Sequence, residues 1–218
     1  MIDISRHREL INTDSFKDDV HVIGVGATGS FVAYMLAKLG IKNIHVYDYD
    51  VVEEHNVANQ IFGLNDVGKK KIDALKERVL TDTGIEIITH DEKITDQRFE
   101  GYVFIMVDSM ASRKEIYTNC IKLKTNVKHA IEPRTGLDMM RVYNISPLNV
   151  DVLKAYEETL YGDDVAEVSA CGSTMSIISS SFAVASWCVR QLINKYNEVP
   201  VSGEILVDFK FNNMFTAF

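Results

Sequence analysis

The sequence predicts an α/β protein with a mainly parallel central sheet, helices on both faces and an antiparallel C-terminal extension. Short apolar or β-branched runs alternate with segments of helical spacing as far as residue 131. This order is typical of parallel strands joined by crossover helices. The first run passes through the loop Gly24-Val25-Gly26-Ala27-Thr28-Gly29 directly into an amphipathic helix. Together these observations indicate a Rossmann-like, nucleotide-binding architecture.

The glycine loop lies between a strand expected over 21–25 and a helix expected over 28–39. Valine and isoleucine in the first segment favour an extended strand. Gly40 is a suitable end for the helix, because glycine readily adopts the left-handed conformation that terminates helices. A second strand is expected over 43–48.

A polar connection follows the second strand. Residues 50–67 are mostly irregular and long enough that a functional role is expected. Helical spacing returns over 68–80, through Ile72, Leu75 and Val79.

Three more strands and one helix are expected next. Residues 85–89 form a third strand, and 102–107 are a continuous apolar run, as in strands buried on both faces. Residues 110–123 have helical spacing, and 127–131 are strand-like.

The pattern changes in the second half of the chain. The segments expected there are a strand over 139–145, a helical or irregular stretch over 147–162, a long apolar helix over 174–196 and strand-like segments over 204–218. We expect one domain over 1–218, with a nucleotide-binding half over 1–135 and an antiparallel and helical extension over 136–218.

Composition argues against several classes of protein. The net charge of −8 argues against a broad nucleic-acid surface. No stretch approaches the roughly 20 apolar residues of a membrane span, and the polar start contains no signal peptide, so we expect no membrane contact and a cytoplasmic location. Three separated cysteines contain no paired Cys-x-x-Cys motif, so no zinc is expected.

The three glycines suit a nucleotide phosphate for different reasons. Gly24 permits the tight turn, Gly26 lets a phosphate approach the backbone, and Gly29 lets the helix pack close to the strand. Free N–H groups and the positive end of the helix dipole face the anion. Asp48, at the end of the second strand, is placed to hold ribose hydroxyls.

Further polar residues favour a nucleoside triphosphate over a dinucleotide. A lysine neutralises phosphate oxygens, an amide binds a phosphate or ribose oxygen, and an Asp at a strand's carboxyl end can hold Mg²⁺. The residues that fit these roles are Asp50, Asn56, Gln60, Lys71 and Asp108.

With these residues in view, the chain resembles the ThiF/MoeB/HesA and ubiquitin-activating-enzyme-like family of adenylyltransferases, over about residues 6–193. The resemblance implies catalytic roles for Asn56, Lys71 and Asp108, with Asp108 holding Mg²⁺. The residues that it and the nucleotide chemistry assign to ATP binding are Gly24, Gly26, Ala27, Thr28, Gly29, Asp48, Asp50, Asn59, Gln60 and Lys71.

The resemblance also implies a reaction and a partner. In that family ATP activates the C-terminal carboxylate of a ubiquitin-like or sulfur-carrier protein or peptide as an acyl-adenylate. A homodimer is expected, in which Arg8 reaches the partner subunit's site. Cys171 precedes the long helix and is the candidate to form a thioester.

The chain lacks the paired zinc cysteines of many relatives, and it departs from the family pattern at two further places. Asn59 stands where the family has a phosphate-contacting arginine, and Ser109 follows Asp108 where the family has an asparagine. Losing the arginine removes a fixed cation, which can lower the rate by orders of magnitude. Arg134 is a candidate replacement; the alternative is a surface turn held by Pro133.

Ordinary structural roles compete with several of these assignments. Lys71 can be a solvated lysine at a helix start, Asp108 a helix N-cap, Asp50 loop surface and Cys171 a small residue packed in a loop. Two other functions also stay open: a non-catalytic nucleotide- or protein-binding relative of the same fold, motivated by Asn59, and an NAD-dependent oxidoreductase, motivated by the glycine loop and Asp48 alone.

Overall fold

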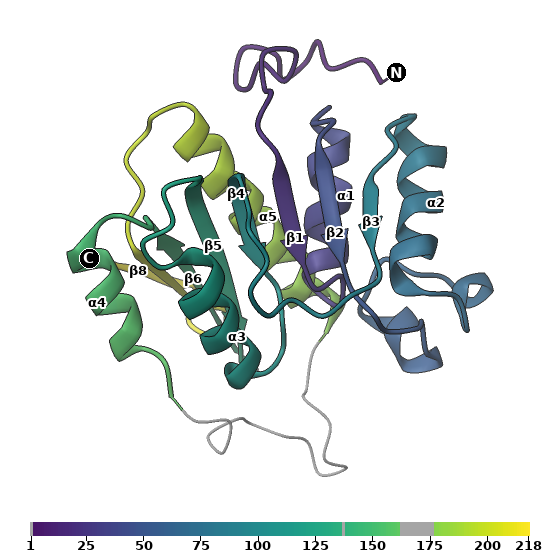
Figure 1. The fold of residues 1–218 in the computed structure, drawn as a ribbon. Helices are drawn as coiled ribbons and strands as arrows, with labels where there is room; N and C mark the ends of the chain where they lie inside the picture. The colour runs from purple at the N-terminus through teal and green to yellow at the C-terminus, as the bar shows by residue number, and fades with distance from the viewer. Residues whose placement is uncertain (1, 137, 162–176) are drawn as a thin grey trace.

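The computed structural model describes residues 2–136, 138–161 and 177–218 (Figure 1). Its strands are β1 (Val20–Ile23), β2 (Ile44–Tyr47), β3 (Ile88–His90), β4 (Gly101–Ile105), β5 (Val127–Thr135), β6 (Met139–Ile145), β7 (Glu204–Asp208) and β8 (Asn213–Ala217). Its helices are α1 (Gly29–Lys38), α2 (Lys71–Thr83), α3 (Met110–Ile116), α4 (Val150–Glu158) and α5 (Ile178–Tyr196). Short helical turns η1 (Glu54–Ala58), η2 (Leu64–Asp66) and η3 (Tyr117–Ile121) complete the set.

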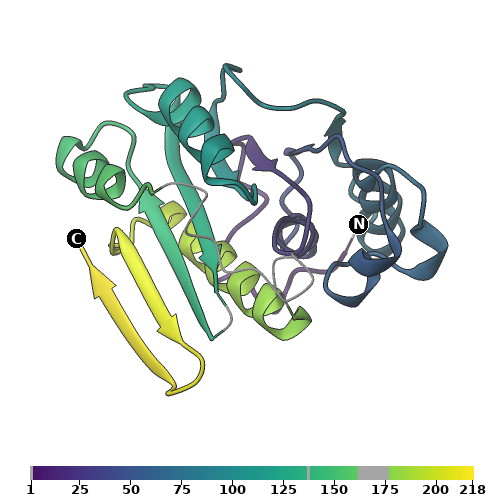
Figure 2. The same ribbon diagram turned by 90° about the horizontal axis from the view of Figure 1, so that it is seen from below.

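Within the described residues, all eight strands join one sheet in the order β3-β2-β1-β4-β5-β6-β7-β8. Strands β1 to β5 pair in parallel, and β6, β7 and β8 continue the same sheet in antiparallel pairing. The hairpin of β7 and β8 lies at the sheet margin (Figure 2). The predicted fold class is confirmed.

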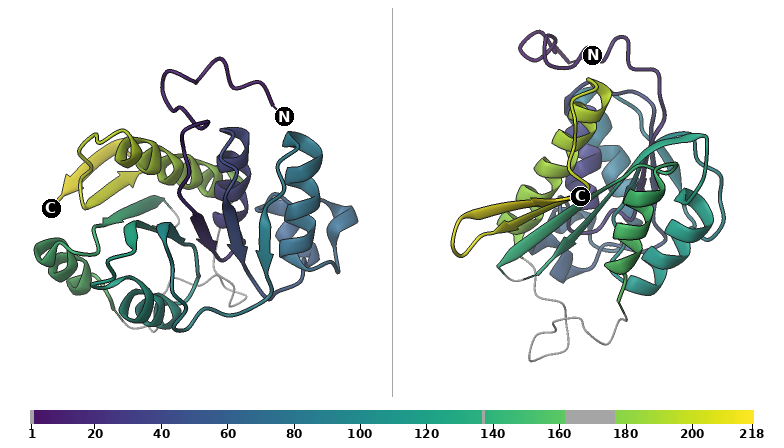
Figure 3. Two further views of the ribbon diagram at one scale, coloured as in Figure 1. Left: turned by 45° about the horizontal axis from the view of Figure 1, so that its top comes forward. Right: turned by 90° about the vertical axis from the view of Figure 1, so that its left-hand side faces the viewer.

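Helices cover both faces of the sheet (Figure 3). Helices α1, α2 and α5 pack on one face through strand residues such as Val22, and α3, η3 and α4 pack on the other through residues such as Ile23. Side chains of a strand alternate between faces, so both need apolar residues here. This explains why the run in β4 is apolar without interruption: all five of its residues are buried.

Several element boundaries differ from expectation. The third strand begins at Ile88, three residues later than predicted, and residues 117–121 form a π-helical turn at the end of α3. Strand β5 continues to Thr135, so Glu132, Pro133 and Arg134 lie inside a strand and do not follow one. Long-range pairing with β6 extends this strand past the apolar run that the sequence shows.

The end of α1 is as expected. Gly40 has a φ of +91° just past the end of α1, as a helix-terminating glycine should. Cys120 and Cys188 are buried. None of the described helices has the length and apolar character needed to cross a membrane.

Candidate functional site

The glycine loop joins the end of β1 to the start of α1. Gly24 has a φ of +89°, and a Cβ there would lie 2.8 Å from the carbonyl oxygen of Met106. A Cβ on Gly29 would lie 1.9 Å from the carbonyl oxygen of Gly24, so only glycine lets α1 begin this close to the turn. The structural reasons predicted for Gly24 and Gly29 therefore hold.

Gly26 differs from its two neighbours in the loop. Among the described residues, apart from its two chain neighbours, no atom lies within 4 Å of a Cβ built at this position, so these residues leave the space beside its backbone open. It lies just before the N-terminus of α1, where free N–H groups and the helix dipole favour an anion. Its geometry suits the close approach of a phosphate.

The carboxylate of Asp48 ties the end of β2 to the glycine loop. Its Oδ2 accepts a hydrogen bond from the Val25 amide at 2.8 Å, and its Oδ1 accepts one from the Asp50 amide at 2.9 Å. A carboxylate can accept about four hydrogen bonds, so Asp48 keeps capacity for ligand hydroxyls. Ribose binding by Asp48 stays a prediction.

Lys71 is not a solvated lysine. Its side chain is 10% exposed, and Nζ lies 2.8 Å from Oδ2 of Asp50, whose side chain is 52% exposed. The Lys71 amide also donates to the Asp50 carbonyl at 3.0 Å. Hydrogen bonds and this ion pair thus connect the glycine loop, Asp48, Asp50 and Lys71 in one series.

The two preceding lysines have separate partners. Lys69 pairs with Asp66 and Glu77, and Lys70 pairs with Asp91. A shared anion is therefore not needed to explain three adjacent lysines, and Lys71 alone among them joins the series of contacts that begins at the glycine loop.

The turn η1 places three predicted ligands beside α1. Asn56 is buried, and its Oδ1 accepts the Glu53 amide at 3.0 Å. The Ile61 amide donates to Oγ of Ser30 in the first turn of α1, which fixes this segment against the helix start.

Asn59 and Gln60 each present a buried oxygen that lacks a partner. Neither Asn59 Oδ1 nor Gln60 Oε1 has a hydrogen bond within the part of the chain that the structure describes. A buried unpaired amide oxygen is costly, and a ligand hydroxyl would satisfy it. These atoms, together with the open space at Gly26, fit a nucleotide at this edge of the sheet.

Asp108 is not the N-cap of α3. That role belongs to Ser109, whose Oγ accepts the Ser112 amide at 3.2 Å. Asp108 itself is exposed, and its side chain makes no hydrogen bond or ion pair among the described residues. A single carboxylate of this kind fits Mg²⁺, which is usually held by one or two carboxylates together with substrate phosphates.

The end of β4 brings Asp108 to the same sheet edge as the glycine loop. The Met106 amide donates to the carbonyl of Ile23 at the end of β1. No hydrogen bond or ion pair among the described residues joins Asp108 or Asn56 directly to Lys71, whose Nζ pairs with Asp50. The same ranges contain no group of three or more His, Cys, Asp or Glu side chains that could hold a metal ion.

Arg8 lies at the opposite edge of the sheet. It is exposed and pairs with Asp14 in the N-terminal arm. This arm contacts the far end of α1, where His7 Nε2 lies 3.1 Å from the Leu39 carbonyl oxygen. Arg8 thus has no access to the glycine loop of its own chain. Cys171 lies outside the described residues.

Arg134 occupies neither of its two predicted settings. It is buried within β5, its Nε lies 2.9 Å from Oε2 of Glu132, and its Nη1 donates to the Thr159 carbonyl at 2.7 Å. Burial alone would lower its pKa, but Glu132 raises it above the usual value. Arg134 is neither a surface turn residue nor a free cation available to replace the missing arginine.

Sequence reasoning missed the buried cluster around Glu132. Its carboxylate is fully buried and contacts Arg113 Nη1 at 2.6 Å, Arg134, and the hydroxyl of Tyr156 at 3.1 Å. Burial, with a further contribution from Glu132, raises the pKa of Tyr156 well above its usual range. The signal that could have found this cluster is the pair of opposite charges directly after an apolar strand pattern.

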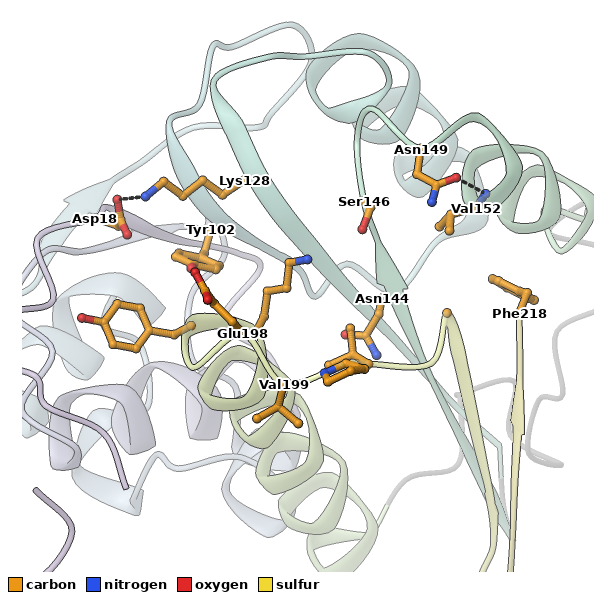
Figure 4. A pocket seen from close by; sticks show the side chains of 15 residues that line it. Asp18, Tyr102, Lys128, Asn144, Ser146, Asn149, Val152, Glu198, Val199 and Phe218 are labelled. Atoms are coloured by element: carbon orange, nitrogen blue, oxygen red, sulfur yellow. Dashed lines mark hydrogen bonds and ion pairs between the residues drawn. The ribbon is translucent and has the colours of Figure 1, made fainter. Parts of the chain in front are cut away.

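A hollow of about 710 Å³ lies elsewhere, at the amino-terminal end of β5 (Figure 4). Asp18, Lys128, Asn144, Glu198 and Phe218 are among its lining residues, and Lys128 is paired with Asp18 at 2.7 Å. None of the predicted nucleotide ligands lines it.

The chain is similar to known proteins of one family. The model of the ThiF family matches residues 11–214. The NEDD8-activating enzyme E1 catalytic subunit of Arabidopsis thaliana is 35% identical over 112 residues, which cover 47% of this chain and 25% of that protein. The tRNA threonylcarbamoyladenosine dehydratase of Bacillus subtilis is 31% identical over 112 residues, covering 47% of this chain and 44% of that protein.

Solved structures share the fold over nearly the whole chain. Escherichia coli MccB superposes with a TM-score of 0.77 at 17% identity, covering 95% of this chain and 64% of that one. The matched regions are less than half the length of both curated relatives, so this chain corresponds to only part of each.

Proposed function

Because the chain belongs to the ThiF family, we propose that it is an ATP- and Mg²⁺-dependent adenylyltransferase. Its substrate is the C-terminal carboxylate of a ubiquitin-like or sulfur-carrier protein or peptide. The observation that carries the proposal is the series of contacts from the glycine loop through Asp48 and Asp50 to Lys71 at the carboxyl edge of the sheet.

The relatives support this class of substrate. The names of two of them are NEDD8-activating enzyme and ubiquitin-like modifier-activating enzyme. Structures of MccB contain ATP in one case and N-formylated MccA in another. The second of these names states that a ubiquitin-like modifier is activated, and the proposal takes this class of substrate for the present chain.

In the proposed reaction a carboxylate oxygen attacks the α-phosphorus of ATP. The bond to the oxygen that bridges the α- and β-phosphates breaks, and pyrophosphate leaves. No general base is required, because a carboxylate is ionised at neutral pH. Mg²⁺ bound with Asp108 would neutralise charge on the phosphates.

The protein's own groups act on the α-phosphate and the ribose. Backbone N–H groups at Gly26 and at the N-terminus of α1 donate hydrogen bonds to phosphate oxygens, and Asp48 accepts hydrogen bonds from the ribose hydroxyls. Lys71, held by Asp50, stabilises the negative charge that develops in the transition state. Arg8 acts at the site of the partner subunit in a homodimer, and Cys171 is the candidate to take the activated acyl group as a thioester.

The experiment uses ATP labelled at its α-phosphate, Mg²⁺ and peptides that end in glycine. We expect pyrophosphate release and a labelled acyl-adenylate that depend on the free carboxylate, with the amidated peptide as control. Failure of the intact protein to bind ATP would refute the proposal.

A second candidate is a nucleotide-binding module without turnover. It is favoured by Asn59, whose uncharged amide stands where the family has an arginine. Saturable ATP binding without pyrophosphate exchange would support this alternative, and exchange that is lost in Lys71→Ala would exclude it.

A further inference from the structure

The buried cluster around Glu132 is expensive to maintain. Two guanidinium groups and one carboxylate are withdrawn from water, since Glu132 is 0% exposed and Arg113 and Arg134 are each 8% exposed. Replacing such buried ion pairs by apolar residues of similar volume is often neutral or stabilising. Stability alone therefore explains the cluster poorly, and its position at the sheet edge becomes informative.

One contact leads from the cluster to the nucleotide site. Arg113 Nη2 donates to the carbonyl oxygen of Val107, the residue directly before Asp108. On its other side, the Val107 amide nitrogen would lie 3.4 Å from a Cβ at Gly24. Arg113 thus holds the peptide group between Val107 and Asp108, which lies beside the glycine turn.

The backbone that follows Asp108 in the chain is also fixed. Ser109 caps α3, and the Arg113 amide donates to the Ser109 carbonyl at 3.1 Å. The backbone is fixed before and after Asp108, while its carboxylate is exposed. This is the arrangement needed to present one carboxylate in a constant orientation to a ligand outside the protein.

We propose that Arg113 is a positioning residue for Asp108 and that Glu132 orients Arg113. The planar guanidinium reaches the Glu132 carboxylate and the Val107 carbonyl at the same time, which a lysine, as a single point charge, would not do. The inference rests on the proposed function, because the role of Asp108 with Mg²⁺ belongs to that proposal.

A double-mutant cycle with Arg113→Lys and Asp108→Asn tests this role. Loss of a group that orients a metal ligand typically costs 10- to 100-fold in metal affinity or activity. We expect Arg113→Lys to lower pyrophosphate exchange about tenfold and to raise the half-saturating Mg²⁺ concentration about tenfold. If Arg113 acts only through Asp108, the double variant will be no slower than Asp108→Asn alone.

The matched control is Arg141→Lys. Arg141 on β6 forms another Arg–Glu ion pair, with Glu204 on the neighbouring strand β7. Its exchange rate and Mg²⁺ dependence should be those of the wild type. Should Arg113→Lys prove too unstable to assay, Glu132→Asp, which shortens the pair and keeps its charge, carries the same expectation. The inference would be overturned if the fold-losses in exchange rate of the two single variants multiplied in the double variant. It would also be overturned if Arg113→Lys kept the Mg²⁺ dependence of the wild type.

Failure of the proposed function gives a different result. If the wild type binds Mg²⁺ and ATP without releasing pyrophosphate, the Mg²⁺ dependence of ATP binding is measured for the same three variants. The double variant is then expected to bind no more weakly than Asp108→Asn alone. If it does not bind ATP at all, the proposed function fails, and this inference fails with it.

Discussion

Replacing Gly29 by alanine should destabilise the protein, whereas the same replacement at Gly26 should leave its stability unchanged. The new Cβ at position 29 would lie 1.9 Å from the Gly24 carbonyl oxygen and 3.0 Å from the Met106 Cβ. Because real Cβ contacts essentially never fall below 3.0 Å, the turn and the helix must separate by about 1 Å. At position 26 no atom of the ranges that the structure describes lies within 4 Å of the new Cβ, its two chain neighbours aside.

The size of the destabilisation depends on which atom the new methyl group meets, here the backbone carbonyl oxygen of Gly24. Overpacking typically costs about 1 to 3 kcal/mol, and a backbone carbonyl cannot rotate away as a side chain can, so the upper end applies. Alanine returns at most about 1 kcal/mol through its better helix propensity. We expect Gly29→Ala to lower the free energy of unfolding by about 2 kcal/mol, which in a chain of this size lowers Tm by about 4 to 8 °C.

The two variants should separate stability from ligand binding. Thermal and urea unfolding measure the stability of each protein, and isothermal titration with Mg²⁺ and ATP measures binding. Gly26→Ala should unfold within about 0.5 kcal/mol of the wild type yet bind ATP at least about tenfold more weakly, because its methyl group occupies the space that a phosphate enters.

Three results would contradict these expectations. Equal destabilisation by both variants would show that the space beside Gly26 is not open in solution. A wild-type Tm for Gly29→Ala would refute the close approach of α1 to the turn. Unchanged ATP affinity in Gly26→Ala would refute the assignment of this loop as the phosphate cradle.

Three other perturbations test the site and the core. Lys71→Ala should lower pyrophosphate exchange about 100-fold and cost less than about 1 kcal/mol of stability, because its partner Asp50 is half exposed; exchange at the wild-type rate would contradict the role of Lys71. Burial, with His45 adding to the effect at His21, lowers the pKa of His21 to about 4, and burial likewise lowers the pKa of His129 to about 4. As the pH falls, these histidines become protonated in the unfolded chain near pH 6.5 but in the folded protein only near pH 4. The free energy of unfolding should therefore be highest above pH 6.5 and decrease towards pH 4, by at most about 3 kcal/mol for each histidine. Urea unfolding at pH 7 and pH 4.5 measures this, and a smaller loss is expected in His129→Gln. Burial raises the pKa of Cys120 to about 11 and that of Cys188 above its usual range, so iodoacetamide at pH 8 should label neither in the folded protein, as mass spectrometry of tryptic peptides will show.

Features that depend on neighbouring residues in the chain were predictable. The order of strands and helices follows from local apolar spacing, and Gly24 and Gly29 have the contacts that their spacing predicts. Asp48 lies beside the glycine loop because the carboxyl ends of adjacent parallel strands meet at one sheet edge.

The partners of charged side chains were decided by the tertiary structure. Lys69 and Lys71 are two residues apart, yet they pair with different carboxylates from different segments. Ser109, one residue beyond Asp108, is the N-cap, which leaves the aspartate exposed.

The sequence by itself therefore determined the parallel sheet and the glycine turn, because steric and periodic constraints act between residues close in the chain. Only the tertiary structure placed Glu132 and Arg134 inside a strand and brought Arg113 to the residue before Asp108. The charges of Arg113 and Glu132 interact across 19 positions of the sequence, and a sequence does not show which of many possible pairs is buried until the sheet has assembled.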